Sequence, residues 1–279
     1  SSMVRPLRAE AGPLLSPAMS PISENHAFGS LGFLWAESER GRASYQTFAG
    51  SLVLGGEWQS PKLPTLAIGG DLVALQITNL QTDLPPAIDE GQLFVDLGIV
   101  RLHSKFMVFH RKVGKAYMAI TPFLRVALPT DTSRNNESRQ TPIRRVLDDR
   151  VALASYMLME PGVSVGVLLH PITFYMHQSA VLAPIYGEVF HFLWSMHYGI
   201  GANIKELFDI TLETTWLGRP TEDFRNQKLS ALSLNPGMRL HVAPFSYELS
   251  LRIGLTEDAR APHGKVTASF TVFWRPSFP

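Results

Sequence analysis

The chain of 279 residues is long enough for one or two domains, or for a single large barrel. Lys and Arg number 25 against 24 Asp and Glu, so the chain lacks the basic excess of a general nucleic-acid binder. The absence of cysteine excludes disulfides, thiolate zinc sites and cysteine nucleophiles. No apolar run approaches the ~18 residues that a membrane helix needs.

The first 26 residues are irregular and rich in proline and serine, and they predict a tail or a segment that plugs a lumen. Residues 27–279 alternate apolar and polar positions with the two-residue period of β-strands, between polar or Gly/Pro-containing breaks. This pattern predicts about twelve strands, at 27–37, 43–57, 64–79, 91–110, 116–129, 149–159, 162–176, 184–199, 204–217, 229–242, 245–256 and 264–275. A change of phase between Ile99 and His103 indicates a bulge or a turn inside the fourth of them.

The strand at 245–256 raises the question of which face is inside. Tyr247, Leu249 and Leu251 share an apolar face, whereas Glu248 and Arg252 lie on the opposite, polar face. In a soluble sandwich the apolar face would form the core. In a transmembrane barrel the apolar face would contact lipid and the polar face would line the lumen.

The breaks between the predicted strands favour the membrane barrel. Odd-numbered connections, such as TDTSRNNESRQTPIRRVLDD, are longer and polar, whereas even-numbered ones are mostly tight, as in EPG, GIGAN and AP. Outer-membrane barrels have short periplasmic turns and longer extracellular loops at alternate ends. Aromatic residues near predicted strand ends fit an interfacial girdle, namely Trp58, Tyr198, Trp216, Tyr247 and Trp274. The sequence therefore predicts an all-β fold, a single antiparallel transmembrane β-barrel at residues 27–279.

This interpretation assigns residues to the two faces of the wall. The predicted lumen-lining residues are Asp209, Glu213, Arg239, His241, Glu248, Arg252, Arg125, His170 and His191. The predicted lipid-facing residues are Leu249, Leu251, Ile253, Leu240, Phe270 and Trp274. A tight turn at Ala243-Pro244 would set Arg239 opposite Glu248 and Asn235 opposite Arg252, with Asp209 diagonally near Arg239.

The chain also resembles a family of bacterial outer-membrane barrels. Strand-and-turn motifs occur in LFVDLGIVRL, FLRVALPTDT, GEVFHFLWSMHYGIG, LSLNPGMRLHVAPFSYELSLRIGLTED and ASFTVFW, which together cover roughly residues 90 to 276. They resemble barrels labelled as transporters, including barrel regions placed ahead of peptidoglycan-binding modules. The resemblance carries no catalytic signature, so it implies a fold and an integral outer-membrane location, not an activity.

Two function classes follow from the sequence. The first is a narrow diffusion channel or passive transporter for small solutes. The second is a structural barrel with an occluded lumen, which docks other envelope proteins through its loops or its N-terminal tail. Barrels of eight strands fill their own interior and barrels of sixteen leave a pore, so a count of about twelve strands does not distinguish the two classes. The resemblance favours the channel. The expected surroundings are outer-membrane lipid, and no nucleic acid, cofactor or metal is expected.

A lipid esterase is the minor alternative. His177 and Ser179 lie two residues apart on one predicted strand face, with Glu188 on the next, and outer-membrane lipid hydrolases place a lipid-facing Ser two residues after a His. Ala180-Val181 replaces the Asn-Gly that usually follows that serine, so we expect no enzyme. We also expect His170 and His191 to face each other across two strands as hydrogen-bonded lumen residues, not as metal ligands.

Overall fold

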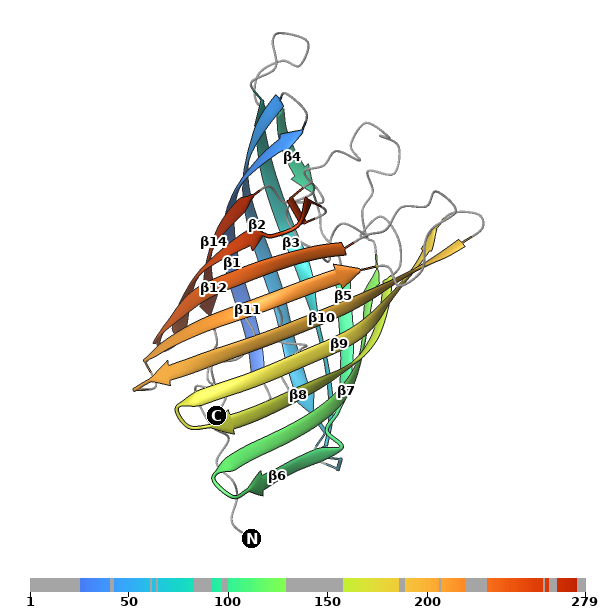
Figure 1. Ribbon diagram of the computed structural model, residues 1–279, viewed down its shortest axis with the longest axis vertical. Helices are drawn as coiled ribbons and strands as arrows, with labels where there is room; N and C mark the ends of the chain where they lie inside the picture. The colour runs from blue at the N-terminus through green and yellow to red at the C-terminus, as the bar shows by residue number, and fades with distance from the viewer. Residues whose placement is uncertain are drawn as a thin grey trace.

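The chain folds as one closed antiparallel β-barrel of twelve strands (Figure 1). The computed structural model describes residues 26–40, 43–60, 62–63, 65–82, 92–96, 100–128, 158–185, 189–205, 207–218, 230–257, 259–260 and 265–274. The strand segments are β1 (His26–Arg40), β2 (Ala43–Gln59), β3 (Leu66–Thr82), β4 (Gln92–Asp96), β5 (Val100–Phe106), β6 (Phe109–Val113), β7 (Ala116–Leu128), β8 (Leu158–Leu169), β9 (Ile172–Ile185), β10 (Val189–Ile204), β11 (Phe208–Gly218), β12 (Ser230–Val242), β13 (Phe245–Gly254) and β14 (Val266–Trp274). The predicted tail at 1–26 lies, except for His26, outside these described residues.

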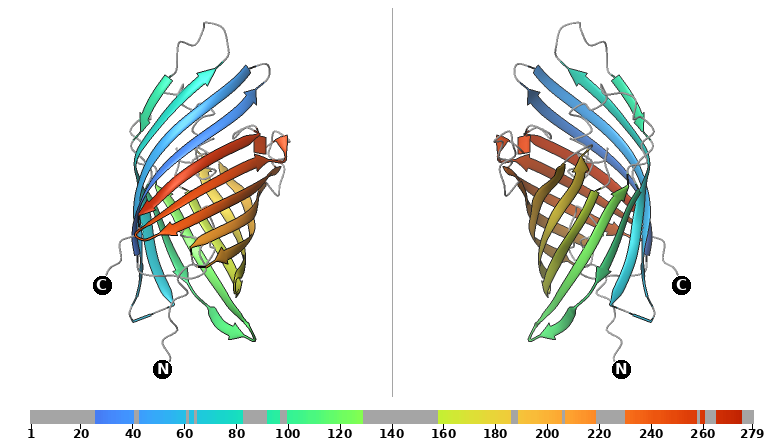
Figure 2. Two further views of the ribbon diagram at one scale, coloured as in Figure 1. Left: turned by 90° about the vertical axis from the view of Figure 1, so that its left-hand side faces the viewer. Right: turned by 90° about the vertical axis from the view of Figure 1, so that its right-hand side faces the viewer.

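The first and last strands close the barrel. β1 pairs with β14 from Gly29 opposite Trp274 to Glu37 opposite Val266. The other strands pair with their neighbours along the chain, with β4, β5 and β6 together taking the place of one strand. Figure 2 shows the tilted strands running round the whole wall. Since closure leaves no sheet edge within the paired region, the backbone hydrogen bonds are satisfied inside the wall, as hydrocarbon requires.

Segments β4, β5 and β6 form one interrupted strand between β3 and β7. β4 and β5 both pair with β3, whereas β5 and β6 both pair with β7. The break between β5 and β6 falls opposite Thr121 and Pro122 of β7, and proline cannot donate a backbone hydrogen bond to a ladder. Residues 97–99 between β4 and β5, where the predicted phase change begins, lie outside the described residues, and β4 and β5 keep one register against β3, with Gln76 opposite Asp96 and Leu72 opposite Val100.

The sequence-based strand boundaries between residues 149 and 204 are wrong, although the strand count is right. The predicted connection at 160–162 lies inside β8, the predicted connection at 177–183 lies inside β9, and that at 199–203 lies inside β10. The real turns are at 170–171 and 205–207. Pro161 and Gly162 resemble strand breakers, but β8 tolerates Pro161 because its ladder with β9 is interrupted between Met159 and Gly162.

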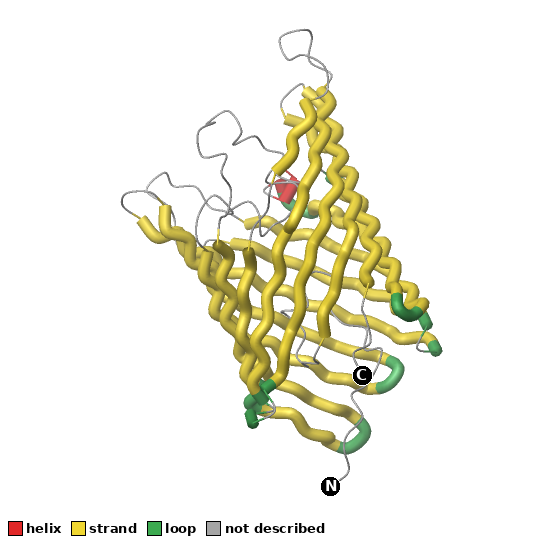
Figure 3. Tube along the Cα trace, turned by 180° about the vertical axis from the view of Figure 1, so that it is seen from behind, coloured by secondary structure: helices red, strands yellow, loops and turns green. Residues whose placement is uncertain are grey.

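Short turns gather at one end of the barrel. Residues 60–65, 114–115, 170–171, 205–207 and 243–244 connect strands there, and β1 begins and β14 ends at the same rim. Figure 3 shows the described turns in green at this lower rim. The opposite end carries the long connections at 129–157 and 219–229, so short and long connections alternate, with 41–42 and 186–188 as short exceptions. No helix among the described residues is long and apolar enough to cross a membrane.

The wall is polar inside and apolar outside. Leu249 and Leu251 on β13 are 45% and 40% exposed, whereas Glu248, which precedes Leu249, and the inner carboxylate Glu213 are 5% and 0% exposed. A water-soluble protein would bury the leucines and expose the carboxylates. The outer surface therefore suits contact with lipid, and the polar residues lie on the inner wall.

Candidate functional site: the charged inner wall

The inner wall of the barrel carries its ionisable side chains in interacting groups, each spread over two or three strands. Alternation along each strand sends every second side chain inward, so residues paired across neighbouring strands meet on the inner surface. The groups lie on β11–β13, β9–β11, β7–β9 and β2–β5. The candidate site is built from these four groups.

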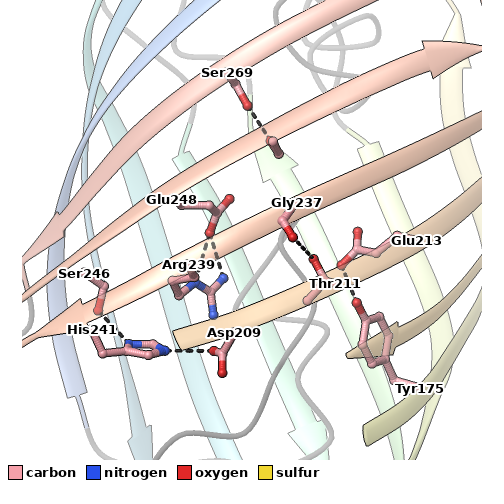
Figure 4. Close-up of polar contacts among 11 residues, drawn as sticks. Tyr175, Asp209, Thr211, Glu213, Gly237, Arg239, His241, Ser246, Glu248 and Ser269 are labelled. Carbon is pink, nitrogen blue, oxygen red and sulfur yellow. Dashed lines mark hydrogen bonds and ion pairs between the residues drawn. The ribbon is translucent and has the colours of Figure 1, made fainter. Parts of the chain in front are cut away.

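The group on β11–β13 centres on an ion pair. The Arg239 guanidinium donates from Nε and Nη2 to Glu248 Oε2 at 3.1 and 2.7 Å (Figure 4). Asp209 lies opposite Arg239, 2.7 Å from His241 Nε2, and accepts a hydrogen bond from the Asn203 amide at 2.5 Å. The predicted facing of Arg239 and Glu248 is confirmed, but Asp209 is directly opposite Arg239, not diagonal to it.

The second predicted pair of this register is Asn235 and Arg252. Direct pairing of β12 and β13 is interrupted between Leu234 and Gly237, at Pro236, so no ladder pair joins Asn235 to Arg252. The pairing on both sides of the gap nevertheless keeps the predicted register. Asn235 is buried and donates to Thr215 Oγ1 at 3.1 Å, and Arg252 is half-buried.

The group on β9–β11 joins two strands across a third. The Tyr175 hydroxyl on β9 donates to Glu213 Oε1 on β11 (Figure 4), and its ring passes over Gly199, the residue of β10 that lies between them. A Cβ atom at Gly199 would collide with that ring, so only glycine fits there. His197 Nε2 lies 3.2 Å from Glu213 Oε2, and the His177 ring, which pairs with His197 across β9 and β10, is 5.4 Å from the His197 ring.

The group on β7–β9 contains the candidate esterase serine. Arg125 on β7 forms an ion pair with Glu160 on β8, and the Ser179 hydroxyl on β9 donates to Glu160 Oε1 at 2.7 Å. Ser179 and His177 are 4% and 2% exposed and point inward, not toward lipid. The third candidate, Glu188, lies outside the described residues.

The group on β2–β5 was missed from the sequence. Glu57 Oε2 on β2 lies 2.7 Å from His103 Nε2 and 2.8 Å from Lys105 Nζ, both on β5. The His103 ring passes over Gly69 of β3, which separates β2 from β5, in the same manner as Tyr175 over Gly199. An ion pair between Asp71 and Arg101 joins β3 to β5 nearby. The only signal in the sequence was the two-residue spacing of Arg101, His103 and Lys105.

Two predicted lumen histidines are placed differently by the structure. His170 is exposed in the turn between β8 and β9, so it does not lie on the inner wall. His191 pairs with Ala183 on β9, and its side chain lies outside what the structure describes. The two therefore do not face each other, because the predicted connection at 177–183, which would have set them opposite one another, lies inside β9, and His170 lies in the turn at 170–171.

The predicted lipid-facing residues lie on the outer surface. Leu249, Leu251, Phe270 and Trp274 are exposed, and Leu240 and Ile253 are half-buried. Of the predicted girdle aromatics, Trp58, Tyr247 and Trp274 lie near the short-turn rim and Trp216 near the other end. Tyr198 lies inside β10, not at its end.

The described inner wall is close to electrically balanced. Its carboxylates are Glu57, Asp71, Glu160, Asp209, Glu213 and Glu248, and its permanent cations are Arg101, Lys105, Arg125, Arg239 and Arg252. Each carboxylate has a cation or a histidine within 3.2 Å. Within the described part of the chain, no cluster of His, Asp and Glu could hold a metal ion.

The fold is that of bacterial outer-membrane barrels. An outer-membrane channel of Pseudomonas putida F1 superposes with a TM-score of 0.67 at 7% identity, covering 91% of this chain and 97% of that one. The NanC porin reaches a TM-score of 0.48 at 8% identity over 89% and 98% of the two chains. The β domain of the Bordetella autotransporter BrkA reaches 0.47 at 11% identity over 91% and 100%. No protein-family model and no curated protein matches the sequence.

Proposed function

We propose that this integral outer-membrane barrel is a narrow channel for small polar solutes. The observation that carries the proposal is the inner wall, on which ionisable and hydroxyl side chains from all sides of a closed barrel point to its axis. Removing a charge from water costs several kcal/mol even when a partner is present. A lumen that needed only to be filled would be stabilised as well by apolar side chains, so the polar wall favours contact with water and solute.

The pairing of the charges on the inner wall indicates how selective such a channel is between cations, anions and neutral solutes. Four of the six carboxylates form an ion pair with an arginine or lysine and the other two lie against histidines, so charges of both signs lie side by side over most of the described wall. A pore selects ions by rings or patches of one sign. We therefore expect weak preference between small cations and anions, and passage of neutral or zwitterionic polar solutes.

One observation favours the alternative, a structural barrel with an occluded lumen. Several charged side chains of the inner wall are almost inaccessible to solvent, with Glu213, Lys105 and Asp209 all at 1% exposure or less. An occluded barrel would act as a scaffold, docking envelope proteins through its loops or N-terminal tail. Such partners belong to this alternative only.

Conductance of the purified protein in planar bilayers separates the two functions. The channel predicts discrete steps with a reversal potential near zero in a salt gradient. The scaffold predicts a folded, inserted barrel with no steps. Heat-modifiable migration on a gel shows that the barrel is folded in the same preparation, so absence of conductance cannot be attributed to unfolded protein.

Two finer features belong to the same proposal. We assign the barrel to the transporter-labelled, peptidoglycan-associated type on the strength of the motifs at residues 90 to 276. We also propose that it is not an enzyme, since the Ser179 hydroxyl is engaged by Glu160 and lies on the inner wall.

A further inference from the structure

A polar group interrupts the apolar outer surface of the barrel. Gln178 on β9, Tyr198 on β10 and Thr214 on β11 point outward, each near the middle of its strand. Tyr198 pairs with Thr214 on one side and with Met176 on the other. The group therefore lies at mid-height, where the surrounding lipid is hydrocarbon and not headgroups.

Gln178 is exceptional in this surface. On the described outward faces of β7–β14 it is the only side-chain amide, and its neighbours there include Met176, Met196 and Val163. This part of the chain was predicted to be a connection, so the outward position of Gln178 was not expected from the sequence. An amide without partners in hydrocarbon costs several kcal/mol, so such a residue requires an explanation.

The contacts within one chain involve the amide nitrogen of Gln178 and not its carbonyl oxygen. Gln178 Nε2 donates to the Tyr198 hydroxyl oxygen at 3.1 Å and lies 3.8 Å from Met176 Sδ. The Tyr198 hydroxyl in turn donates weakly to Met196 Sδ at 3.6 Å. Among the contacts of the described residues, none reaches the amide carbonyl oxygen, Oε1. The carbonyl oxygen of Gln178 is therefore a strong hydrogen-bond acceptor at the lipid-facing surface, next to the two N–H donors of the same amide.

We propose that a second copy of this chain packs against this group, with the two Gln178 amides hydrogen-bonded to each other across a two-fold axis. An amide is self-complementary, because the carbonyl of one copy accepts from the N–H of the other and the reverse. A two-fold axis along the membrane normal brings a residue next to its own copy and keeps both barrels in one orientation. Association inside a bilayer depends on packing and on such polar contacts, since lipid supplies no hydrophobic drive.

The neighbouring residues fit a contact between two curved walls. Met176 and Met196 flank the amide, and methionine adapts its shape to an irregular partner. Ala180 and Thr214 are small, which lets the two walls approach at the level of the amide. This proposal does not rest on the channel function, because the interface lies outside the lumen.

Disulfide cross-linking tests the proposal cleanly, because the native chain has no cysteine. The variant Met196→Cys, which places a thiol directly opposite Gln178 and keeps the amide, is expected to form a covalent dimer when it is reconstituted in lipid vesicles and oxidised. The matched control is Leu54→Cys, which is 49% exposed on β2 on the opposite side of the closed sheet and is expected to remain monomeric. Equal cross-linking of both variants, or of neither, would overturn the proposal.

A second variant tests whether the Gln178 amide itself holds the two copies together. Gln178→Leu is expected to weaken dimerisation about tenfold, measured by subunit counting in bilayers, because two hydrogen bonds between copies are lost. The control Ile200→Leu changes an exposed residue on β10 and is expected to leave dimerisation unchanged. If Gln178→Leu dimerises as the native chain does, or if the native chain is monomeric, Gln178 is satisfied within its own copy and the inference is wrong. Conductance of the Gln178→Leu variant is expected to equal that of the native chain.

Discussion

Leu251→Arg tests the orientation of the whole wall. Leu251 is 40% exposed on the outer face of β13 and lies opposite the small Ala268 of β14. It is six residues from Phe245, at the short-turn rim, and at ~3.3 Å per residue and a tilt of ~45° this sets Leu251 about 14 Å above that rim. Since the apolar band of such barrels is ~25 Å tall, Leu251 lies near the membrane midplane.

Arginine at this depth is expected to lower the free energy of unfolding by ~2–4 kcal/mol, whereas near the rim the cost falls to ~0–1 kcal/mol. The matched control is therefore Phe245→Arg, on the same strand and equally exposed at 41%. In equilibrium terms, Leu251→Arg reduces the ratio of folded to unfolded protein by roughly 30- to 700-fold. Ser250→Arg, on the inner face, is expected to be better tolerated than Leu251→Arg.

Urea titration of each variant in lipid vesicles, followed by tryptophan fluorescence, measures these free energies. The decisive quantity is the difference between Leu251→Arg and Phe245→Arg. If the two cost the same, depth in a membrane does not govern the outer face. If Leu251→Arg yields a protein that is folded and soluble without detergent, the orientation of the wall is wrong.

Three further outcomes follow from the inner wall. Glu248→Gln removes a fixed negative charge beside Arg239, so the reversal potential in a salt gradient is expected to shift toward anions with folding nearly intact; an unchanged potential would refute a role for this pair in the conduction path. Gly199→Ala drives a methyl group into the Tyr175 ring and is expected to cost ~1–3 kcal/mol in the same urea titration, whereas Gly50→Ala, whose Cβ would lie 4.0 Å from its nearest neighbour, is expected to be nearly neutral. Ser179→Ala is expected to leave any lipid hydrolysis by the preparation unchanged, and a loss of that activity would support the esterase.

The register of β12 and β13 could be predicted because one short turn determines it. With only Ala243 and Pro244 between the strands, each residue has one possible partner, and Arg239 opposite Glu248 follows. The strand count and the outward leucines followed from the two-residue alternation, which needs no knowledge of neighbours.

The boundaries of β8–β10 and the group on β2–β5 could not be predicted in this way. Pro161 and Gly162 signal a turn in the sequence, and only the interrupted ladder explains why the strand continues through them. Glu57 and Lys105 lie on strands that are not adjacent in the sheet, so no rule of paired neighbours would have joined them. That contact requires knowing that a ring from β5 crosses a glycine of β3.

Side chains that reach over a glycine to the next strand but one also bear on how the barrel comes apart. The Tyr175–Glu213 hydrogen bond requires β9, β10 and β11 together, and the His103–Glu57 contact requires β2, β3 and β5. An isolated hairpin contains two strands, so it cannot hold either contact and remains only marginally stable. Detaching any one of the three strands removes the contact as completely as detaching them all. These contacts therefore make the loss of neighbouring strands cooperative and oppose fraying of the wall one strand at a time.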